Sequence, residues 1–488
     1  MLQLATAGFL LVPWESSHRE GECGSGEATK VWSSVTWFAK RPLRLPGRHL
    51  ALRRRSSNHP ADRLYDHEHQ ASVALPPEIW ALVAANFVIA LGFGIVAPAV
   101  PQFAHSFGVG VAAASTVISA FALMRVLFAP IGARLMQRCG ERPVYLTGLV
   151  ITALSSGACV FAQSFWQLLV FRSLGGIGST MFTVSALGLI ARIAPPHGRG
   201  RVSGLYATSF LLGWIIGPLV GSVLVHFGLR VPFAIYSSAL LIAAALVYLK
   251  LRNSAIAASG KSGPPSRMSF HDGLAVPAYR AALWSNFADG WVVDGVRMAL
   301  VPLFVIEVLG ADPAIAGIAL TVFGAGTALM LFPAGRLSDR FGRKPFLLVG
   351  TAVSGIATVA MGFTASLPSF LAAALVAGLG SGLINSTQQA AVADIVGSKA
   401  RGGPVFAAFG MAADIGAVLG PIVAGALAQW LSYSAAFAIT GAVLLIATVG
   451  WLSVADTLAR PSHPAATTPT SDQTREAALG RDPSAGAN

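Results

Sequence analysis

The segment GRLSDRFGRKPFL at Gly335–Leu347 has a counterpart, ARLMQRCGERPVY, at Ala133–Tyr145. At the glycine that both segments share, the offset is 202 residues (342 minus 140). A second pair of segments, GWIIGPLVG at Gly213–Gly221 and GAVLGPIVAG at Gly416–Gly425, repeats at an offset of 203 (420 minus 217). Two separate motifs that repeat at nearly one offset indicate that the chain contains a duplicated unit.

The composition around these repeats is that of a membrane protein. Of the 488 residues, 54% are hydrophobic and only 11% are charged, whereas soluble domains contain about 25% charged residues. The mean hydropathy is +0.65. A soluble fold must cover its surface with polar groups, so this excess of apolar residues predicts that a lipid bilayer surrounds the chain.

Apolar segments of about 20 residues or more, the length that crosses a bilayer, occur at 79–101, 112–134, 143–163, 165–191, 203–226, 231–249, 281–304, 313–334, 345–364, 367–391, 405–429 and 434–455. The sequence therefore predicts an all-α membrane protein with twelve transmembrane helices. They form two six-helix bundles, residues 77–252 and 280–457, related by pseudo-twofold symmetry and joined by a cytoplasmic linker at 253–279.

The charge of the loops predicts the orientation. Lys and Arg gather in the even-numbered loops, at 138–142, 192–201, 250–280, 336–344 and 399–401, whereas the odd-numbered loops carry only Arg230. By the positive-inside rule both termini are cytoplasmic, and we expect a multi-pass protein of the cell (inner) membrane. The net charge of +13 is then explained by loops and tails that face anionic lipid, with no need for nucleic acid.

The two ends of the chain differ in composition from the predicted spans. Residues 1–76 are basic and contain no long apolar run, and they predict a disordered cytoplasmic extension or, alternatively, a wrongly assigned start codon. Residues 458–488 are rich in Ala, Pro, Ser and Thr and predict a disordered cytoplasmic tail.

The repeated loop segment resembles a motif of the major facilitator superfamily, G-x-L-x-D-R-x-G-R-K. The resemblance covers residues 79–455, and the loop residues that carry it are Gly335, Asp339, Arg340, Gly342, Arg343 and Lys344. The first copy departs from the motif at Ala133, Gln137 and Glu141. An acid–base cluster at a membrane edge predicts a cytoplasmic gate that braces helix ends; plain positive-inside topology is the alternative, but topology would not require the spacing of Gly and Asp.

The fifth predicted helix carries small residues four apart. Gly213, Gly217 and Gly221 share one face, and Pro218 removes a backbone donor beside them. This run resembles the motif that marks the exporter (antiporter) families of the superfamily. The stretch Gly92–Pro101 is similar to the twelve-helix drug:proton antiporter group. Ordinary small-residue packing is the alternative for this helix face.

Ionisable residues within spans are functional candidates because their burial is costly. Arg172 begins the run RSLGGIG, similar to the family's helix 4 motif, whose arginine is linked to proton transfer; a structural salt bridge is the alternative. Arg125 lies near the middle of the second span, and Asn86 is the only strongly polar side chain of the first. Proton coupling must therefore use another carboxylate, or none.

The seventh span is the most polar. At 100° per residue, Asn286, Asp289, Asp294 and Arg297 fall within 140° of arc, so one polar face must look into the bundle. Asp294 and Arg297, three residues apart, pair with each other in one interpretation, whereas Asp294 serves transport in the other. The candidate residues for proton coupling are Asp289, Asp294, Asp414 in the eleventh span, and Arg172. The candidate buried charge partners are Arg125 and Arg297.

A polar patch in the tenth span completes the candidates. Asn385, Gln388 and Gln389, with Asn286, line the substrate path or form hydrogen bonds between helices. The three cysteines are scattered, and we expect no metal site. No nucleotide loop or catalytic motif occurs, so the sequence predicts neither an enzyme nor a cofactor.

The resemblance implies a monomeric secondary transporter that couples efflux of small, largely apolar compounds to protons by alternating access, as in drug resistance. A facilitator or importer of a specific solute, such as a sugar or another metabolite, would share the fold and is the alternative.

Overall fold

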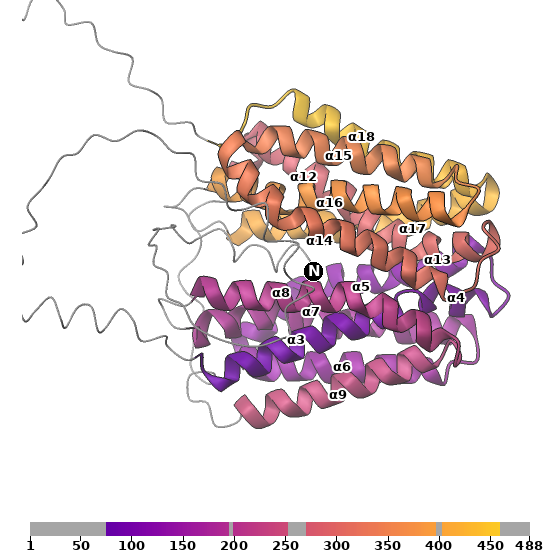
Figure 1. Cartoon of the computed structure of the whole chain (residues 1–488). Coiled ribbons are helices and arrows are strands. Elements are labelled where there is room, and N and C mark those ends of the chain that lie inside the picture. The colour runs from indigo at the N-terminus through magenta and orange to yellow at the C-terminus, as the bar shows by residue number, and fades with distance from the viewer. Residues whose placement is uncertain (1–74, 195–198, 252–269, 397–402, 459–488) are drawn as a thin grey trace, which may run out of the picture. The chain divides into compact units, whose positions relative to one another are not determined.

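The structure is a computed structural model that describes residues 75–194, 199–251, 270–396 and 403–458 (Figure 1). The predicted extension at 1–76 and tail at 458–488 lie outside these residues, apart from their inner edges, as does most of the predicted linker at 253–279. Throughout the described ranges the elements are helices, with no strand.

The helices of the first half, residues 75–251, are α3 (Pro77–Val96), α4 (Ala99–His105), α5 (Val111–Cys139), α6 (Glu141–Val160), α7 (Phe165–Ile193), α8 (Arg199–Val225) and α9 (Val231–Leu251). Those of the second half, residues 270–458, are α11 (Phe270–Ala275), α12 (Pro277–Asp289), η3 (Gly290–Val296), α13 (Arg297–Glu307), α14 (Ile315–Phe341), α15 (Arg343–Met361), α16 (Leu367–Val396), α17 (Gly403–Trp430) and α18 (Tyr433–Leu452).

The predicted spans are present, and the fold class is confirmed. Within the described residues, eleven helices are long and apolar enough to cross a membrane, α3 and α4 counting as one. The remaining predicted span, 281–304, is divided because a π-helix, η3, separates α12 from α13. The span at 281–304 is therefore helical throughout, but the periodicity of 100° per residue used for its polar face does not hold through the π-helix.

The glycine shared by the two repeated segments ends a long helix in each half. Gly140 ends α5 with φ of 85°, and Gly342 ends α14 with φ of 103°. L-residues with a side chain rarely adopt this left-handed region, so glycine is needed where each long helix turns directly into the next. The conserved spacing within the repeated segment is thus explained by a tight turn between consecutive helices.

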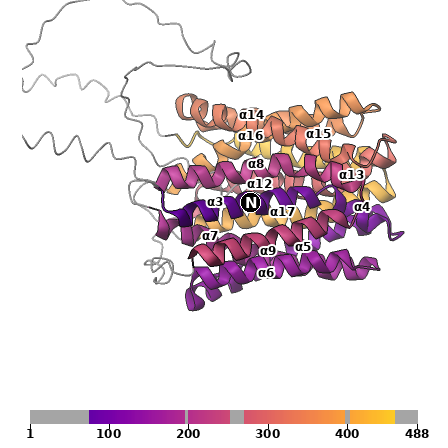
Figure 2. The same cartoon turned by 60° about the horizontal axis from the view of Figure 1, so that its bottom comes forward.

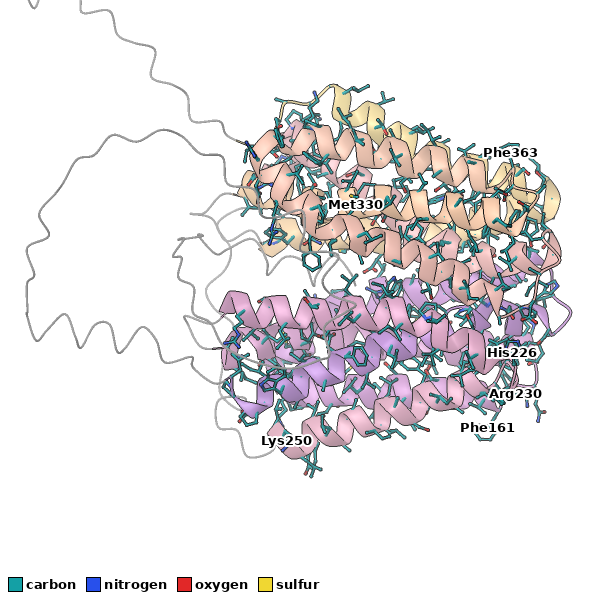
Figure 3. All side chains as sticks on the ribbon, in the orientation of Figure 1. Phe161, His226, Arg230, Lys250, Met330 and Phe363 are labelled. Carbon is teal, nitrogen blue, oxygen red and sulfur yellow. The ribbon has the colours of Figure 1, made fainter. Side chains whose placement is uncertain are left out.

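Consecutive helices run antiparallel, so the loops lie at two ends of the molecule. We call one the basic end, because Arg138, Lys250 and Arg340 lie there, and the other the opposite end. Figure 3 shows Lys250 at the basic end, whereas Phe161, His226 and Phe363 lie at the opposite end.

Apolar side chains on the outer helix faces are exposed to the surroundings. Leu154, Ile242 and Val449 are more than half exposed. Water would disfavour such a surface, whereas lipid tails are as apolar as these side chains. The exposed faces therefore mark the belt that meets the bilayer.

The two halves meet mainly through two helix pairs, α5 with α17 and α8 with α14 (Figures 1 and 2). Small residues permit the close approach: a Cβ at Gly425 of α17 would lie 2.7 Å from Ser115 Oγ of α5. Because lipid supplies no hydrophobic drive between helices, such close backbone packing is a main source of their association.

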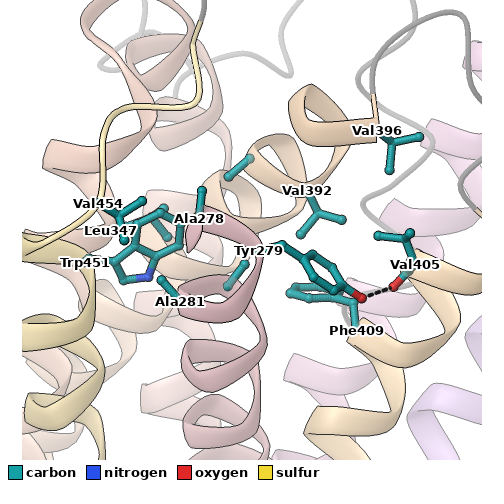
Figure 4. Close-up of a cluster of buried hydrophobic side chains, with 12 residues drawn as sticks. Ala278, Tyr279, Ala281, Leu347, Val392, Val396, Val405, Phe409, Trp451 and Val454 are labelled. Carbon is teal, nitrogen blue, oxygen red and sulfur yellow. Dashed lines mark hydrogen bonds between the residues drawn. The ribbon is translucent and has the colours of Figure 1, made fainter. Parts of the chain in front are cut away.

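Near the basic end, a buried cluster anchors the start of α12 (Figure 4). Tyr279 is fully buried, and its hydroxyl donates a hydrogen bond of 2.7 Å to the carbonyl of Val405 in α17. Trp451 of α18 and Leu347 of α15 belong to the same cluster. The cluster joins five helices of the second half, α12, α15, α16, α17 and α18, and fixes the start of the helix that leads into η3.

Candidate functional site

A cavity of about 40 Å³ lies between the two halves. Its first-half wall is mainly aromatic and basic, and its second-half wall carries one acid; the side chains used below are Phe93, Phe121, Arg125, Arg172, Trp214 and Asp294. Trp214 of α8 stacks on Phe93 of α3 with ring centroids 5.4 Å apart. The volume is far below the 300–1,000 Å³ of pockets that hold drug-sized ligands, so the cavity is too small for such a molecule in this arrangement of the halves.

An ion pair crosses between the halves at the edge of this cavity. Arg125 Nη2 of α5 lies 3.0 Å from Asp414 Oδ1 of α17. Both side chains are mostly buried, and each lies near the middle of its helix. Both residues were among the predicted candidates, but their pairing was not predicted because no local sequence pattern relates residues in different halves.

Arg172 lies within the aromatic wall, with 3% of its surface exposed. Its guanidinium carbon stands 4.4 Å from the ring centroid of Phe121 and 5.6 Å from that of Phe93. Its Nε and Nη1 are buried without a hydrogen-bond partner among the described residues. The structural salt bridge considered for this arginine is absent from the ion pairs of the described part of the chain.

The π-helix positions the two acids of the seventh span. Asp289 is the last residue of α12, and Asp294 lies five residues further on, within η3. A π-helix bonds residues five apart, which brings such residues closer to one face than 100° per residue predicts. Both acids line a second small cavity, of about 10 Å³, beside the main one. Single π-turns of this kind occur frequently at functional sites.

Asp289 and Arg297 face the interior of the second half. Asp289 accepts a hydrogen bond of 3.5 Å from Ser381 Oγ of α16, a residue that sequence analysis missed. The guanidinium carbon of Arg297 stands 3.4 Å from the ring centroid of Phe323. Among the described ion pairs none joins Arg297 to Asp294 directly, although the carboxylates of Asp294 and Asp289 both act electrostatically on the Arg297 guanidinium.

The polar residues of α16 fall into two groups, one that forms hydrogen bonds to α12 and one that contains buried atoms without a partner in the described chain. Gln388 donates to Asn286 Oδ1 at 3.0 Å and accepts from Ser285 at 3.2 Å, so these amides tie α16 to α12. Asn385 lines the cavity of Asp289 and Asp294, and its Oδ1 is buried without a partner in the described chain. Both amide atoms of Gln389 are likewise buried and unpartnered there.

At the basic end, the loop motif forms a cluster around Arg343. This side chain pairs with Asp339, donates to Ser338 Oγ at 2.9 Å and pairs with Asp394 of α16 at 3.1 Å. Beyond the residues that sequence analysis named, Asp456, which follows α18, accepts from the Arg343 backbone N–H at 3.0 Å. The cluster therefore holds three helix ends of the second half and the segment after α18 together.

The other motif residues are placed as follows. Lys344 donates to the carbonyl of Leu452 at 2.9 Å. Arg340 stands over the ring of Phe341, on the outside of the cluster. A Cβ added at Gly335 would meet open space, so close packing within this half does not account for that glycine.

The divergent copy in the first half forms an ion pair of its own. Glu141, which stands where the motif has a basic residue, lies 2.5 Å from Arg192 near the end of α7. The carboxylate is almost fully buried. The departure from the motif therefore keeps an ionic contact between helix ends and changes its partner.

The glycine face of α8 packs against α3. Cβ atoms at Gly213 and Gly217 would lie 2.7 Å from the backbone of Leu91 and Gly94. In the second half, Gly416 and Gly420 of α17 approach the backbone of Trp291 in η3 in the same way. This arrangement confirms close backbone contact along the repeated helix; the direction of transport is a separate matter.

Residues 82–293 and 282–483 each match the profile described as Major Facilitator Superfamily. The chain belongs to the major facilitator superfamily. The two matches correspond to the two halves, and membership makes this multi-pass membrane protein a transporter by family rather than an enzyme.

Curated relatives extend the comparison. The chain is 28% identical over 382 residues to "Multidrug resistance protein MdtG" of Salmonella paratyphi A, covering 75% of this chain and 93% of the relative. The same protein of Salmonella typhi matches with the same identity and coverage. These bacterial relatives place this superfamily member in a cell membrane.

Solved structures show the same fold. A bacterial homologue of the human lysosomal transporter Spinster, in an inward-facing and unoccupied conformation, is similar with a TM-score of 0.64 and 18% identity, covering 77% of this chain and 95% of that one. A D-xylose–proton symporter is similar with a TM-score of 0.61 and 16% identity, covering 78% and 98%. At these identities the likeness concerns the fold alone.

Proposed function

We propose that this transporter exports small, largely apolar compounds in exchange for protons, and that its two halves rock about the cavity between them. The observation that carries the proposal is the pair of intramembrane acids at the interface. Asp294 lines the cavity shared by both halves, and Asp414 forms the ion pair that crosses between them. A proton on either acid changes the charge balance at the surface where the halves meet.

Contacts at the opposite end support an alternating-access mechanism. Gln102 donates to the carbonyl of Pro313 at 3.2 Å, and Gln429 accepts from the Ala112 backbone at 3.0 Å. At the same end, His105 of the first half lies 3.5 Å from the carboxylate of Glu307 in the second. The halves are therefore held together at the opposite end, and rocking would exchange this closure for one at the basic end.

Export is supported by two observations. The Gly213–Gly221 face resembles the exporter motif, and it packs closely on the backbone of α3. The relatives named for multidrug resistance match over most of both chains. We further propose that the protein acts as a monomer, with the basic end and both termini in the cytoplasm.

The test is efflux of a fluorescent cationic dye from cells that express the full chain, with and without a protonophore. We expect the protonophore to abolish efflux, and the Asp289→Asn, Asp294→Asn and Asp414→Asn variants to separate the acid that couples from those that do not. Glu78→Gln is the matched control because Glu78, in the first turn of α3, belongs to no ion pair of the described chain and lines neither cavity. Efflux that ignores both the protonophore and all three variants would refute proton coupling.

The dye screen also tests the alternative function. If the protein reaches the membrane but exports no dye, a specific solute carrier becomes the better description, and metabolite uptake screening would identify its substrate.

A further inference from the structure

One arginine on the cavity wall, Arg172, forms no ion pair within the described residues. Arg172 is almost fully buried, lines the cavity, and holds Nε and Nη1 without partners in the described chain. A buried charge is costly unless it is paired and hydrogen-bonded. The rings of Phe121 and Phe93 stabilise the cation only in part.

The other charges on the cavity wall do not satisfy Arg172. Arg125 engages Asp414 at 3.0 Å across the interface. Asp294 lies on the second-half wall, but no ion pair of the described residues joins it to Arg172. The cavity thus presents a cation on one half and an anion on the other, with apolar and aromatic side chains around them.

We infer that Arg172 is an anion-binding subsite and that the cavity, once widened by separation of the two halves, takes a zwitterionic compound with an aromatic or apolar body. The anionic group of the compound binds the Arg172 guanidinium, its cationic group binds Asp294, and its apolar body packs on Phe93, Phe121 and Trp214. A guanidinium presents several donors in a fixed planar fork that suits a carboxylate. This inference rests on the proposed function only in taking this cavity as the one that transports.

A zwitterion suits the arrangement better than an ion of one sign. A simple organic cation would leave the buried Arg172 without a counter-ion. A simple anion would leave the partly buried carboxylate of Asp294, which is attracted to Arg297, without a direct ion pair. A compound with both groups satisfies both walls and also bridges the two halves. Recognition of such a compound would therefore draw the halves together around it.

Binding of three naphthyl compounds with one aromatic body tests the inference. The probes are 2-naphthylalanine, which carries both charges, 3-(2-naphthyl)propanoate, which lacks the ammonium group, and 2-(2-naphthyl)ethylammonium, which lacks the carboxylate. Affinities are measured by equilibrium dialysis on the full chain in nanodiscs, with empty nanodiscs to correct for partition into lipid. No ion gradient is present.

We expect the zwitterion to bind about tenfold or more tightly than either single-charge analogue, as hydrogen bonds to charged groups commonly give. In Arg172→Gln the advantage over the ammonium analogue should vanish while affinity for that analogue is kept, which also shows that the variant is folded. In Asp294→Asn the advantage over the propanoate should vanish. Arg230→Gln is the matched control, because Arg230 also stands over a phenylalanine ring but lies at the opposite end and donates to the carbonyl of Ala162.

Equal affinity for the three probes, no binding of any of them, or an unchanged preference in Arg172→Gln would overturn the inference. The outcome is separable from the proposed function. Charge-selective binding without proton-driven efflux would leave the subsite in place and refute the coupling. Proton-driven efflux without charge-selective binding would support the coupling and refute the anion-binding subsite at Arg172.

Discussion

Glu141 at the start of α6 pairs with Arg192 near the end of α7, at 2.5 Å. The repeat offset of 202 residues leads from Glu141 to Arg343 (343 minus 141) and from Arg192 to Asp394 (394 minus 192). Arg343 and Asp394 are also paired, at 3.1 Å. The two halves therefore keep one ionic contact at equivalent positions, with the two charges exchanged.

This exchange predicts the effect of charge reversal in the first half. Glu141→Arg places two cations together at a buried position and should destabilise the protein by about 3–5 kcal/mol, as breaking a buried pair does. Glu141→Arg combined with Arg192→Asp reproduces the arrangement of the second half and should recover most of that loss. Thermal unfolding of the purified variants measures both effects.

The control is Arg138→Asp, at the basic end but outside the described ion pairs. A double variant no more stable than Glu141→Arg would mean that the pair does not stabilise the joined helix ends.

The Arg125–Asp414 pair should hold the halves in the arrangement seen here. Asp414→Asn leaves Arg125 inside the interface without its counter-ion and should reduce closure at the opposite end. A short bifunctional thiol reagent between cysteines at positions 112 and 429 reports that closure, because Gln429 contacts the Ala112 backbone. We expect slower cross-linking in Asp414→Asn, and recovery when Arg125→Gln is added, since removing both charges costs less than removing one.

An unchanged cross-linking rate in Asp414→Asn would contradict this role. Cross-linking in Glu78→Gln serves as a control, because Glu78 lies in the first turn of α3 and belongs to no ion pair of the described chain.

Substitution at Gly217 should disrupt the contact of α8 with α3. A Cβ there would lie 2.7 Å from Gly94 Cα, and overpacking of this kind costs about 1–3 kcal/mol. Gly217→Ala should therefore lower the unfolding temperature and transport together. Gly410→Ala is the control, because a Cβ at Gly410 would meet open space and alanine favours the helix. Equal stability of the two variants would show that the glycine face does not depend on close packing.

The orientation can be tested with a cysteine that the chain already has. Cys139 is exposed at the basic end, whereas Cys159 is buried. In a Cys23→Ser background, a membrane-impermeant maleimide should label Cys139 in inside-out vesicles and leave it unlabelled in intact cells. Phe363→Cys, at the exposed position of the opposite end, should be labelled in intact cells. The reverse pattern would overturn the proposed topology.

The helices were predictable because hydropathy and loop charge are local properties of the sequence. The division of the seventh span was not, because a π-helix changes the periodicity on which the helical-wheel argument depends. The pairing of Arg125 with Asp414 depends on how the halves pack, which no local pattern reports. The Glu141–Arg192 pair could have been predicted. The offset of 202 relates these two residues to Arg343 and Asp394, which also carry opposite charges, so the repeat predicts an ionic contact in both halves.

Proton movement and substrate movement measured together in one set of proteoliposomes test the central claim most directly. The full chain is reconstituted with a pH-sensitive dye inside, and an exported compound from the dye screen is supplied with and without an imposed pH gradient. We predict that substrate moves against protons, that each requires the other, and that one of Asp289→Asn, Asp294→Asn and Asp414→Asn separates them. Substrate movement at the same rate without a gradient, with no accompanying change of internal pH, would contradict the account.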